Sequence, residues 1–362
     1  MINMGLFSIF KKNVDKPKHK GFHIVEVLQK QQLNNSAIKI VFDIPDSLKE
    51  EFKFKPGQYI NLVVQIENEE LRRSYSICSS PSEPLSIGVK AIENGKVSNY
   101  LVHSLQVGDL IQISKPEGNF GIKESDCSIV AFAAGSGITP ILSIAKSIEN
   151  TDSKLQLFYG SKSYNEILFR SELENLTNTA TTHFLSQELK EGTVNGRIDE
   201  TTIRNQIKSN LDLLKADSFL ICGPEAMIKC VDENLRFFGV SKEKIRYELF
   251  TTPILMTSES TEITHSNYSG ECNVKVILEG ETVQFKLNTE GETILQATEN
   301  EGLDVPFSCR GGVCCSCKAR VTNGSASMKL NYSLTDDEVK KGYILTCQAH
   351  PTSENVTISF DE

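Results

Sequence analysis

The chain has no long apolar run, no excess of positive charge and no regular disulfide framework. Because no stretch approaches the ~18 consecutive apolar residues of a membrane-spanning helix, we expect no membrane span. The net charge of −9 disfavours nucleic acid as a partner, since phosphate backbones attract basic surfaces. The N-terminal residues show only a short apolar run and no small-residue cleavage site, which predicts no signal peptide. These absences favour a cytoplasmic protein.

The length of 362 residues suits about two or three domains, and a hydrophobic content of 39% is enough for ordinary cores. We see no internal repeat. Acidic side chains are concentrated near the C-terminus, where residues 271–362 hold 14 acidic and 8 basic residues. This charge would either steer a basic partner to that region or simply keep its surface soluble.

Four of the ten cysteines have an informative spacing. Three form C-x4-C-x2-C and the fourth follows 30 residues later: Cys309, Cys314, Cys317 and Cys347. This spacing is typical of ligands to a plant-type [2Fe–2S] cluster, which accepts and donates single electrons. Gly311 and Gly312 allow a tight loop whose N–H groups point at the sulfides. A zinc site or a disulfide pair is the alternative, but zinc ribbons prefer two C-x2-C pairs.

The segments around these cysteines predict a small α+β domain over residues 271–362. They read as a hairpin turning at Glu279-Gly280-Glu281 and then a short helix: residues 274–278, 283–287 and 293–301. This order resembles the plant-type ferredoxin domain, which implies a β-grasp fold. Cys315, which lies between two ligands, is expected to be a small buried filler. The other cysteines show no pairing pattern and suit a reducing compartment.

Residues 21–122 read as short strands separated by turn signals. The clearest are three: residues 38–42, 59–64 and 85–89. Short antiparallel strands with Pro and Gly between them predict a small barrel. Inside this region lie Arg73-Ser74-Tyr75-Ser76 and Gly95-Lys-Val-Ser98, which opens a helix expected over residues 97–105. The loop Pro116-Glu-Gly118-Asn-Phe120 ends the region.

The first of these motifs matches R-x-Y-S, and the region resembles the flavin domain of the ferredoxin–NADP reductase superfamily. The resemblance implies that Arg73 holds a flavin phosphate, Tyr75 stacks on the isoalloxazine and Ser76 reaches flavin N5. Gly95 and Ser98 would bind phosphate at the helix N-terminus. Four residues also match by chance, so a surface arginine and a half-buried strand tyrosine are the alternative. FAD is expected rather than FMN, because most of the family with this domain order uses FAD.

Residues 123–252 alternate apolar strands with helices, which predicts an open parallel α/β sheet. Continuous apolar strands are expected at three places: residues 129–134, 155–159 and 219–222. The first runs into Gly135-Ser-Gly137-Ile-Thr139-Pro140, and the last into Cys222-Gly223-Pro224 and a helix over residues 225–237. The first loop is G-x-G-x-T-P rather than the full G-x-G-x-x-G motif, so a packed strand-to-helix turn is its alternative.

In the same superfamily, a loop like the one containing Gly135, Gly137, Thr139 and Pro140 binds the pyrophosphate of NAD(P)H. The resemblance places Cys222 beside the nicotinamide together with Gly223 and Pro224, where a small thiol lets the ring approach the flavin. A buried structural cysteine is the alternative.

The end of the strand at residues 155–159 is where this superfamily distinguishes NADPH from NADH. Ser161 and Lys162 suit a 2′-phosphate better than a free hydroxyl, so the sequence favours NADPH, with a solvated lysine as the alternative. Arg170 and Arg197 are further candidates. Glu248 and Phe250 are carried over from the family as residues beside the flavin ring. With Ser76 and Cys222, Glu248 completes the expected reacting centre, although no side chain need act as a general acid or base.

The order of the predicted units resembles the reductase components of multicomponent oxygenases. The units are a tail, a flavin barrel, a nucleotide domain, a Thr/Ser-rich linker and a ferredoxin domain: residues 1–20, 21–122, 123–252, 253–270 and 271–362. NAD(P)H would supply two electrons at once and the cluster would accept one, which makes a flavin necessary between them. The linker would let the ferredoxin domain swing.

The electron acceptor is expected to be an oxygenase protein. The chain resembles the reductases of phenylacetyl-CoA epoxidases, which implies such an epoxidase of phenylacetate degradation as the acceptor. A desaturase, a hybrid-cluster protein or a ring-hydroxylating oxygenase are alternative acceptors. Two alternatives are not reductases: a flavin and iron–sulfur redox sensor, and a structural zinc module.

Overall fold

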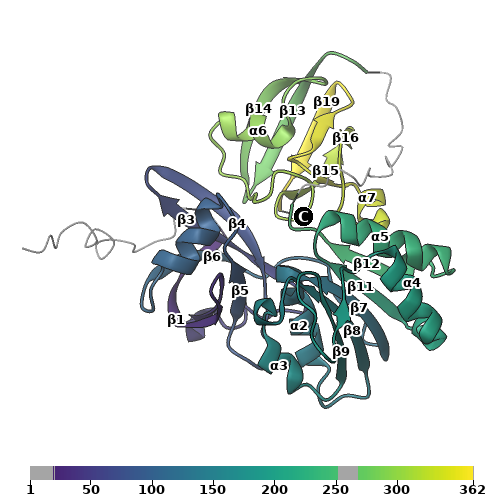
Figure 1. Ribbon diagram of the computed structural model, residues 1–362. Coiled ribbons are helices and arrows are strands. Elements are labelled where there is room, and N and C mark those ends of the chain that lie inside the picture. Colours follow the sequence, from purple (N-terminus) through teal and green to yellow (C-terminus); the bar gives the residue numbers. More distant parts are fainter. Residues whose placement is uncertain (1–18, 20, 252–267, 362) are drawn as a thin grey trace, which may run out of the picture.

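The chain forms three main sheets, one in each predicted unit (Figure 1). This is a computed structural model that describes residue 19, residues 21–251 and residues 268–361. Most of the expected tail and most of the expected linker therefore lie outside the described residues, as does the apolar run near the N-terminus. The fold class expected from the sequence is confirmed: an antiparallel barrel, an open parallel α/β sheet and a C-terminal α+β domain.

The first sheet is antiparallel and curls into a barrel with strand order β4-β3-β6-β1-β2-β5. Strands β2, β3 and β5 are buried over most of their length, and a bridge between Ile77 and Ile87 joins the two edges. After β5 the short helix α1 leads into a wider helical turn that ends at Ser104. The elements are β1 (Phe22–Asn34), β2 (Ala37–Asp43), β3 (Tyr59–Ile66), β4 (Glu69–Ser76), β5 (Ser86–Lys90), α1 (Lys96–Asn99) and β6 (Leu110–Ser114).

The second sheet is parallel, with order β10-β9-β8-β7-β11-β12. Helix α2 covers one face and helices α4 and α5 the other, which explains why β7 and β11 are apolar almost throughout. Helix α5 has the bounds that the sequence predicted. The elements are β7 (Ser128–Ala134), α2 (Ile138–Ser147), β8 (Lys154–Ser161), α3 (Arg170–Glu174), β9 (Thr179–Leu185), β10 (Val194–Asn195), α4 (Glu200–Ser209), β11 (Ser218–Cys222), α5 (Glu225–Phe237) and β12 (Ile245–Glu248).

The third sheet has order β14-β13-β19-β15-β17 and packs against α6. The predicted hairpin is present, with Glu279 and Gly280 alone in the turn, so Glu281 belongs to the strand. The Thr293 hydroxyl caps α6 by accepting from Gln296 N–H. The elements are β13 (Glu271–Leu278), β14 (Glu281–Asn288), α6 (Ile294–Asn300), β15 (Lys318–Asn323), β16 (Ala326–Met328), α7 (Asp336–Lys340), β17 (Tyr343–Leu345), β18 (Ala349–Pro351) and β19 (Asn355–Ser359).

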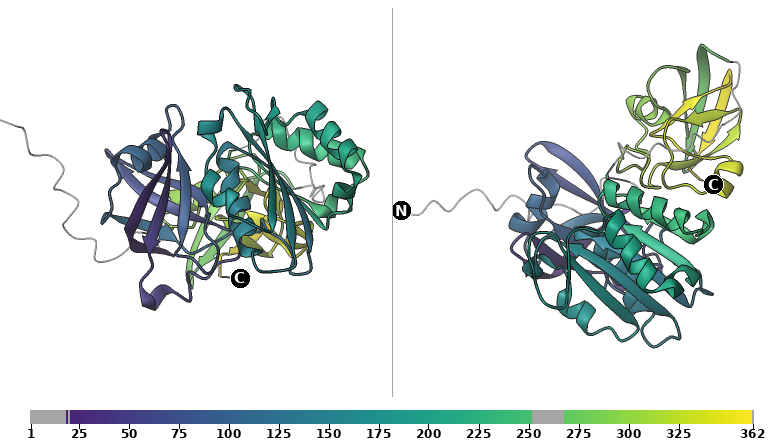
Figure 2. Two further views of the ribbon diagram at one scale, coloured as in Figure 1. Left: turned by 60° about the horizontal axis from the view of Figure 1, so that its bottom comes forward. Right: turned by 45° about the vertical axis from the view of Figure 1, so that its right-hand side comes forward.

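The ferredoxin domain lies over the junction of the other two domains (Figures 1 and 2). Arg72 on β4 donates to Asp304 at 3.0 Å and lies over the Phe307 ring at 4.4 Å. His19, which the sequence placed in the tail, is 8% exposed and lies 2.7 Å from Asp304. On the nucleotide side, Tyr332 packs against the core beneath α4 and α5. These contacts bring the loop at residues 309–317, which carries three of the four expected cluster ligands, to the centre of the molecule. This segment is named the cluster-ligand loop.

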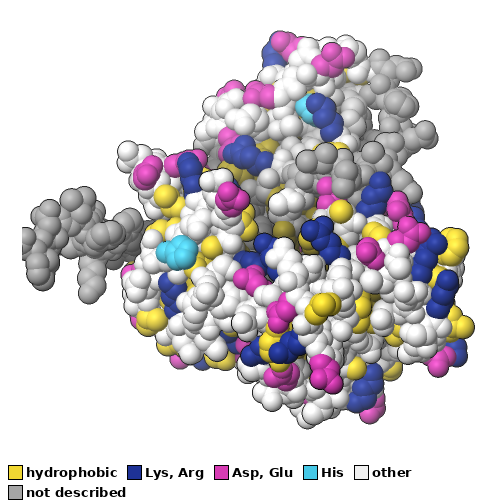
Figure 3. All heavy atoms as spheres, in the orientation of Figure 1, with side chains coloured by type: hydrophobic (Ala, Val, Ile, Leu, Met, Phe, Trp, Pro, Cys, Tyr) yellow, Lys and Arg dark blue, Asp and Glu magenta, His cyan; other side chains and the backbone are white. Residues whose placement is uncertain are grey.

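The helices, the cysteines and the surface charges each bear on an expectation from the sequence. No helix among the described residues is long and apolar enough to cross a membrane. All ten cysteines are free. On the face drawn in Figure 3, acidic and basic side chains are interspersed over all three domains.

Candidate functional site

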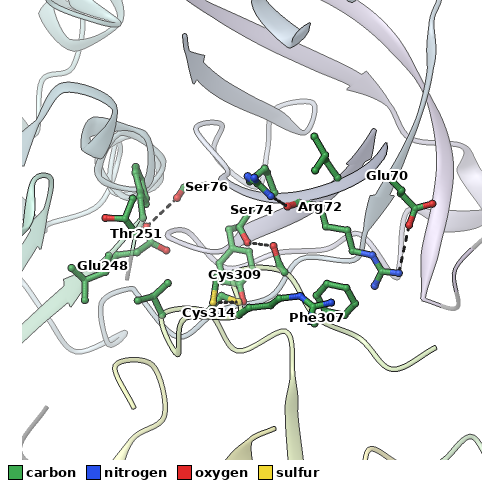
Figure 4. A pocket seen from close by; sticks show the side chains of 17 residues that line it. Glu70, Arg72, Ser74, Ser76, Glu248, Thr251, Phe307, Cys309 and Cys314 are labelled. Atoms are coloured by element: carbon green, nitrogen blue, oxygen red, sulfur yellow. Dashed lines mark hydrogen bonds and ion pairs between the residues drawn. The ribbon is translucent and has the colours of Figure 1, made fainter. Parts of the chain in front are cut away.

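A cavity of about 500 Å³ lies where the three domains meet (Figure 4). Strand β4 forms one wall, the segment after β12 forms another, and the cluster-ligand loop closes it. The lining residues are Tyr59, Glu70, Leu71, Arg72, Arg73, Ser74, Ser76, Glu248, Leu249, Phe250, Thr251, Phe307, Ser308, Cys309, Arg310, Val313 and Cys314. A flavin ring in this cavity would lie within reach of both the nucleotide domain and two of the cluster cysteines.

Ser76, Cys222 and Glu248 come together from three strands, as the sequence predicted for the reacting centre. Ser76 is buried at the end of β4, and its hydroxyl donates to Glu248 Oε2 at 3.0 Å. Cys222 and Glu248 are register partners on β11 and β12, and the Cys222 thiol lies 4.0 Å from the same oxygen. The three side chains therefore form a chain of polar contacts at the cavity wall.

Burial raises the pKa of the two acidic groups in this set of contacts, the Glu248 carboxyl and the Cys222 thiol. Part of Glu248 remains accessible from the cavity, but protein atoms surround its carboxyl group and raise its pKa to about 8. The pKa of the Cys222 thiol is raised well above its usual value by burial and then by Glu248. Both groups therefore carry a proton at neutral pH, and Ser76 has a neutral acceptor.

The other residues of the R-x-Y-S motif point in different directions. Arg73 is exposed and lines the cavity, and it donates to the backbone carbonyl of Arg72 at 2.7 Å. Tyr75 packs against the barrel core and is not among the cavity-lining residues, and burial raises the pKa of its hydroxyl. The arginine is thus free to contact an anion, whereas the tyrosine offers only part of its ring.

The helix expected to bind phosphate begins where the sequence placed it. Gly95 is the N-cap of α1, and an added Cβ there would lie 2.5 Å from the Ser98 hydroxyl. The Ser98 hydroxyl is buried, accepts from Ile92 N–H and donates to the Gly95 carbonyl, both at 3.3 Å. Ser98 therefore shapes the turn, and the first N–H groups of the helix are the better candidates for contact with a phosphate.

The two glycine loops of the nucleotide domain touch each other. A Cβ on Gly137 would lie 2.1 Å from the backbone oxygen of Cys222, so only glycine lets the loops approach so closely. Thr139 and Pro140 are buried in the first turn of α2, where proline is tolerated, and Thr139 donates to the Ser136 carbonyl at 2.9 Å. Gly223 and Pro224 follow Cys222 and begin α5. The two motifs thus form one continuous rim at the carboxyl end of the sheet.

The approach at Gly137 leads to a testable expectation. Replacing Gly137 with alanine should push the two loops apart and weaken NAD(P)H binding by about tenfold or more, because overpacking moves backbone atoms. Binding would be measured by titrating the nucleotide into the flavin-loaded protein. Gly160→Ala is the matched control, since a Cβ there meets only ordinary contacts at 3.5 Å. Equal affinity in both variants would contradict this account.

At the end of β8, cationic side chains surround an aromatic ring. Lys162 is exposed and Ser161 is partly buried, and the backbone of this segment accepts hydrogen bonds from the end of β9. Tyr164 lies between two cations, with Arg170 at 4.2 Å and Lys190 at 3.8 Å from its ring centroid. Arg197, also named from the sequence, is exposed. Tyr164 and Lys190 were not identified from the sequence. Lys190 lies on a different loop, so the sequence alone does not show that it meets Tyr164.

The four expected cluster ligands converge. The Sγ atoms of Cys314 and Cys309 are 3.1 Å apart, and Gly311 N–H donates to Cys309 Sγ at 3.3 Å. Hydrogen bonds from Cys314 and Cys347 lower the pKa of Cys309, and a hydrogen bond from Cys347 lowers the pKa of Cys317. Such contacts place the thiol of the distant Cys347 against the loop that carries the other three.

The four thiols contact one another in a connected group. Cys309 contacts both Cys314 and Cys347, and Cys347 also contacts Cys317. Soft thiolates are the ligands that iron–sulfur clusters take. Cys315 is partly buried rather than fully buried, and its thiol lies 3.6 Å from the Ser333 carbonyl oxygen. The expectation that it is a buried filler is only partly right.

Three families match the chain in the order that the fold has. Residues 24–122 match the oxidoreductase FAD-binding domain, residues 132–233 the oxidoreductase NAD-binding domain, and residues 276–352 the 2Fe-2S iron-sulfur cluster binding domain. Together they cover most of the chain, and they agree with the three sheets.

Two relatives and one solved structure match nearly the whole length. A subunit of the 1,2-phenylacetyl-CoA epoxidase of Escherichia coli K12 is 35% identical over 94% of this chain and 98% of its own. The ferredoxin reductase component of 3-ketosteroid-9-alpha-monooxygenase from Rhodococcus rhodochrous is 27% identical over 89% and 92%. The fold is similar to that of phthalate dioxygenase reductase, with a TM-score of 0.52 and 22% identity over 94% of this chain and 98% of that one.

Proposed function

Because the chain belongs to the ferredoxin-reductase-type oxidoreductases that serve as reductase components of multicomponent oxygenases, we propose specific roles for its residues in that activity. Electrons enter from a nicotinamide held beside Cys222 and leave through a cluster held by Cys309, Cys314, Cys317 and Cys347. One observation carries this proposal: Ser76, Glu248 and two of the cluster cysteines line the same cavity.

The residues around the cavity fit the groups that the family holds. FAD, when bound, takes up two electrons from NAD(P)H and passes them on one at a time to the [2Fe–2S] cluster. The Arg73 guanidinium is free to pair with a phosphate, and Ser76 presents its hydroxyl at the cavity wall. Phe250 is 45% exposed at the cavity and would cover a ring placed there. Filling the cavity would also exclude water from Glu248.

The chain's own residues act mainly by placing groups. Gly137 and Gly223 let the two nucleotide loops pack closely against each other. Cys222 is fully buried and borders the cavity through its contact with Glu248. Ser76 donates to a neutral Glu248, so the hydroxyl is held in a fixed direction at the cavity wall. The cluster loop closes the opposite side, which shortens the path for electrons.

NADPH is the proposed nucleotide rather than NADH. Lys162 and Ser161 lie at the end of β8, and Arg170 and Lys190 stand on either side of Tyr164 nearby. These groups supply positive charge and hydroxyls, which suit a 2′-phosphate. Glu188 is also in this region, but its carboxylate is occupied in accepting from Tyr164 N–H at 2.7 Å.

This choice of nucleotide is tested by reversing the charge of Lys162. Lys162→Glu should raise the KM for NADPH by about tenfold or more while changing the KM for NADH little, because only NADPH brings a phosphate near that side chain. Steady-state kinetics with an artificial acceptor would measure both. Lys208→Glu, an exposed lysine in the last turn of α4, is the matched control. Equal losses with both nucleotides would remove the assignment.

The proposed acceptor is a phenylacetyl-CoA epoxidase, because the relative with 35% identity is a subunit of such an enzyme. The test combines the purified reductase, NADPH and phenylacetyl-CoA with epoxidase subunits from the same organism. Formation of the epoxide in proportion to NADPH consumed would support the assignment. If the reductase consumes NADPH with an artificial acceptor but not with the epoxidase, another oxygenase is the partner. We place this reaction in the cytoplasm, where thiols stay reduced.

A further inference from the structure

The cluster-ligand loop rests on strand β3 of the flavin barrel, directly beside the cavity. Cys315 N–H donates to the Tyr59 hydroxyl at 2.9 Å, and Ser316 Oγ lies 3.5 Å from the same hydroxyl. Asn61 Nδ2 donates to Ser316 Oγ at 3.0 Å. Tyr59 and Asn61 are 6% and 1% exposed, so these contacts are shielded from water. Shielded hydrogen bonds are stronger and costlier to lose than exposed ones.

A second contact holds the other end of the loop. The Ser74 hydroxyl donates to Asn61 Oδ1 at 2.7 Å, so the Ser308 hydroxyl, 2.8 Å from Ser74 Oγ, is the donor in that pair. Ser308 and Ser316 each directly precede a ligand cysteine. Asn61 is therefore linked to both ends of the ligand loop, through its amide nitrogen on one side and through Ser74 on the other.

The same face of the barrel also serves the cavity. In the β3–β4 pair, Asn61 is the register partner of Ser74, and Tyr59 is the partner of Ser76. Directly paired residues of an antiparallel pair project from the same face. One face therefore presents Ser76 to the reacting centre and its three neighbours to the ligand loop, as Figure 4 shows for the two labelled serines.

The Tyr59 ring is held in place by the loop that ends the barrel. Tyr59 and Glu117 exchange backbone hydrogen bonds of 2.9 and 2.8 Å. Gly118 has a φ of +109°, and a Cβ there would lie 2.9 Å from the Tyr59 ring, so the ring lies flat against a position that only glycine can fill. The Glu117 side chain is partly buried, and its carboxyl group accepts from Asn61 at 3.2 Å. The loop thus supports the residues that touch the ferredoxin domain.

We propose that Tyr59 and Asn61 are positioning residues that seat the cluster-ligand loop against the flavin cavity and thereby set the rate of electron transfer from flavin to cluster. Each acts through Cys315 and Ser316 rather than by touching the reacting atoms. This inference rests on the proposed electron route. The contacts of Tyr59 and Asn61 with Cys315 and Ser316 are named the seat. The inference also gives a function to the loop at residues 116–120, which ends the barrel and supports the seat.

The test removes single atoms from each side of the seat. Tyr59→Phe deletes the hydroxyl that accepts from Cys315, and Ser316→Ala deletes the partner of Asn61 from the ferredoxin side. Hydrogen exchange of the peptide over residues 314–317, followed by mass spectrometry, should become about fivefold faster in both variants. In single-turnover mixing with NADPH, cluster reduction should slow by about fivefold in both variants. Flavin reduction should stay within about twofold of the wild type in Ser316→Ala, because Ser316 does not line the cavity.

Tyr343→Phe is the matched control, because it removes the same atom from a ferredoxin residue on β17 that is not part of the seat. Exchange in the β13 peptide reports on folding and should not change in any variant. Unchanged exchange over residues 314–317 in both seat variants would overturn the proposal. So would an equal slowing of flavin and cluster reduction in Ser316→Ala, since the contact would then act on the flavin step. If the wild-type cluster itself is not reduced by NADPH, the electron route fails, but the exchange comparison still tests the seat.

Discussion

Replacing Cys347 with serine is expected to abolish the [2Fe–2S] cluster and the reduction of the partner oxygenase, while NADPH still reduces the flavin. Cys347 is the ligand that comes from outside the loop, between β17 and β18, and its thiol contacts those of Cys309 and Cys317. A serine hydroxyl is harder and far less acidic than a thiol, so it does not replace a thiolate on iron. Iron and sulfide analysis and the visible spectrum would show the loss.

The control for this experiment is the neighbouring cysteine that is not a proposed ligand. Cys315→Ser should retain iron and sulfide, because the Cys315 thiol lies against the Ser333 carbonyl and the domain core, and its backbone N–H is unchanged. Ferricyanide, which takes electrons directly from a reduced flavin, would show that the flavin half of Cys347→Ser remains active. A fully loaded cluster in Cys347→Ser, or a lost cluster in Cys315→Ser, would contradict the ligand assignment.

Local patterns predicted the elements well where one physical signal was strong. Helix α5 was predicted at its observed bounds because Pro224 precedes it and apolar residues recur at helical spacing. The β13–β14 hairpin followed from alternation around a Gly-containing turn. The helix expected over residues 97–105 is less regular. Helix α1 ends at Asn99 and continues as a wider helical turn over Tyr100–Ser104. The two differ in the spacing of their backbone hydrogen bonds, which the side-chain pattern does not reveal.

The site was predictable only where residues lie inside a motif. Ser76, Cys222 and Glu248 lie far apart in sequence, and their meeting follows from the resemblance and from strand ends that share one edge. The raised pKa of Glu248 was not predictable, because it depends on atoms contributed by other domains. The seat formed by Tyr59 and Asn61 was missed for the same reason: its partners are about 255 residues away, as for Asn61 and Ser316.

The junction of the domains combines charged and neutral contacts, and the two kinds lie at different places. Arg72, His19 and Asp304 form the charged group at one edge, with Arg72 only 7% exposed. The neutral hydrogen bonds of Tyr59 and Asn61 lie beside the ligand loop. Salt screens the exposed part of the charged group but barely affects the buried hydrogen bonds. Both kinds of contact include buried side chains and hold the ferredoxin domain to the barrel.

The second large effect is expected from the chain of contacts between Ser76 and Glu248. Ser76→Ala should slow flavin reduction by NADPH about a hundredfold, because it removes the hydroxyl that links the cavity wall to Glu248 where charge changes during the reaction. In the wild type, flavin reduction should also slow by about tenfold per pH unit above a pH of about 8, where Glu248 ionises. An ionised carboxylate 3.0 Å from Ser76 would hold the hydroxyl proton and add negative charge at the cavity wall.

The Glu248→Gln variant removes the carboxylate charge but keeps an acceptor for the Ser76 hydroxyl. Glutamine stays neutral and still accepts from Ser76, so its rate should match the wild type at pH 7 and exceed it at pH 9. The folded chain keeps the Glu248 proton between its ordinary pKa of 4.5 and about 8, whereas the unfolded chain loses it. Stability should therefore fall as pH rises through this range, and the melting temperature of Glu248→Gln should depend less on pH. Identical pH profiles for the rate in the two proteins would show that another group controls the alkaline decline.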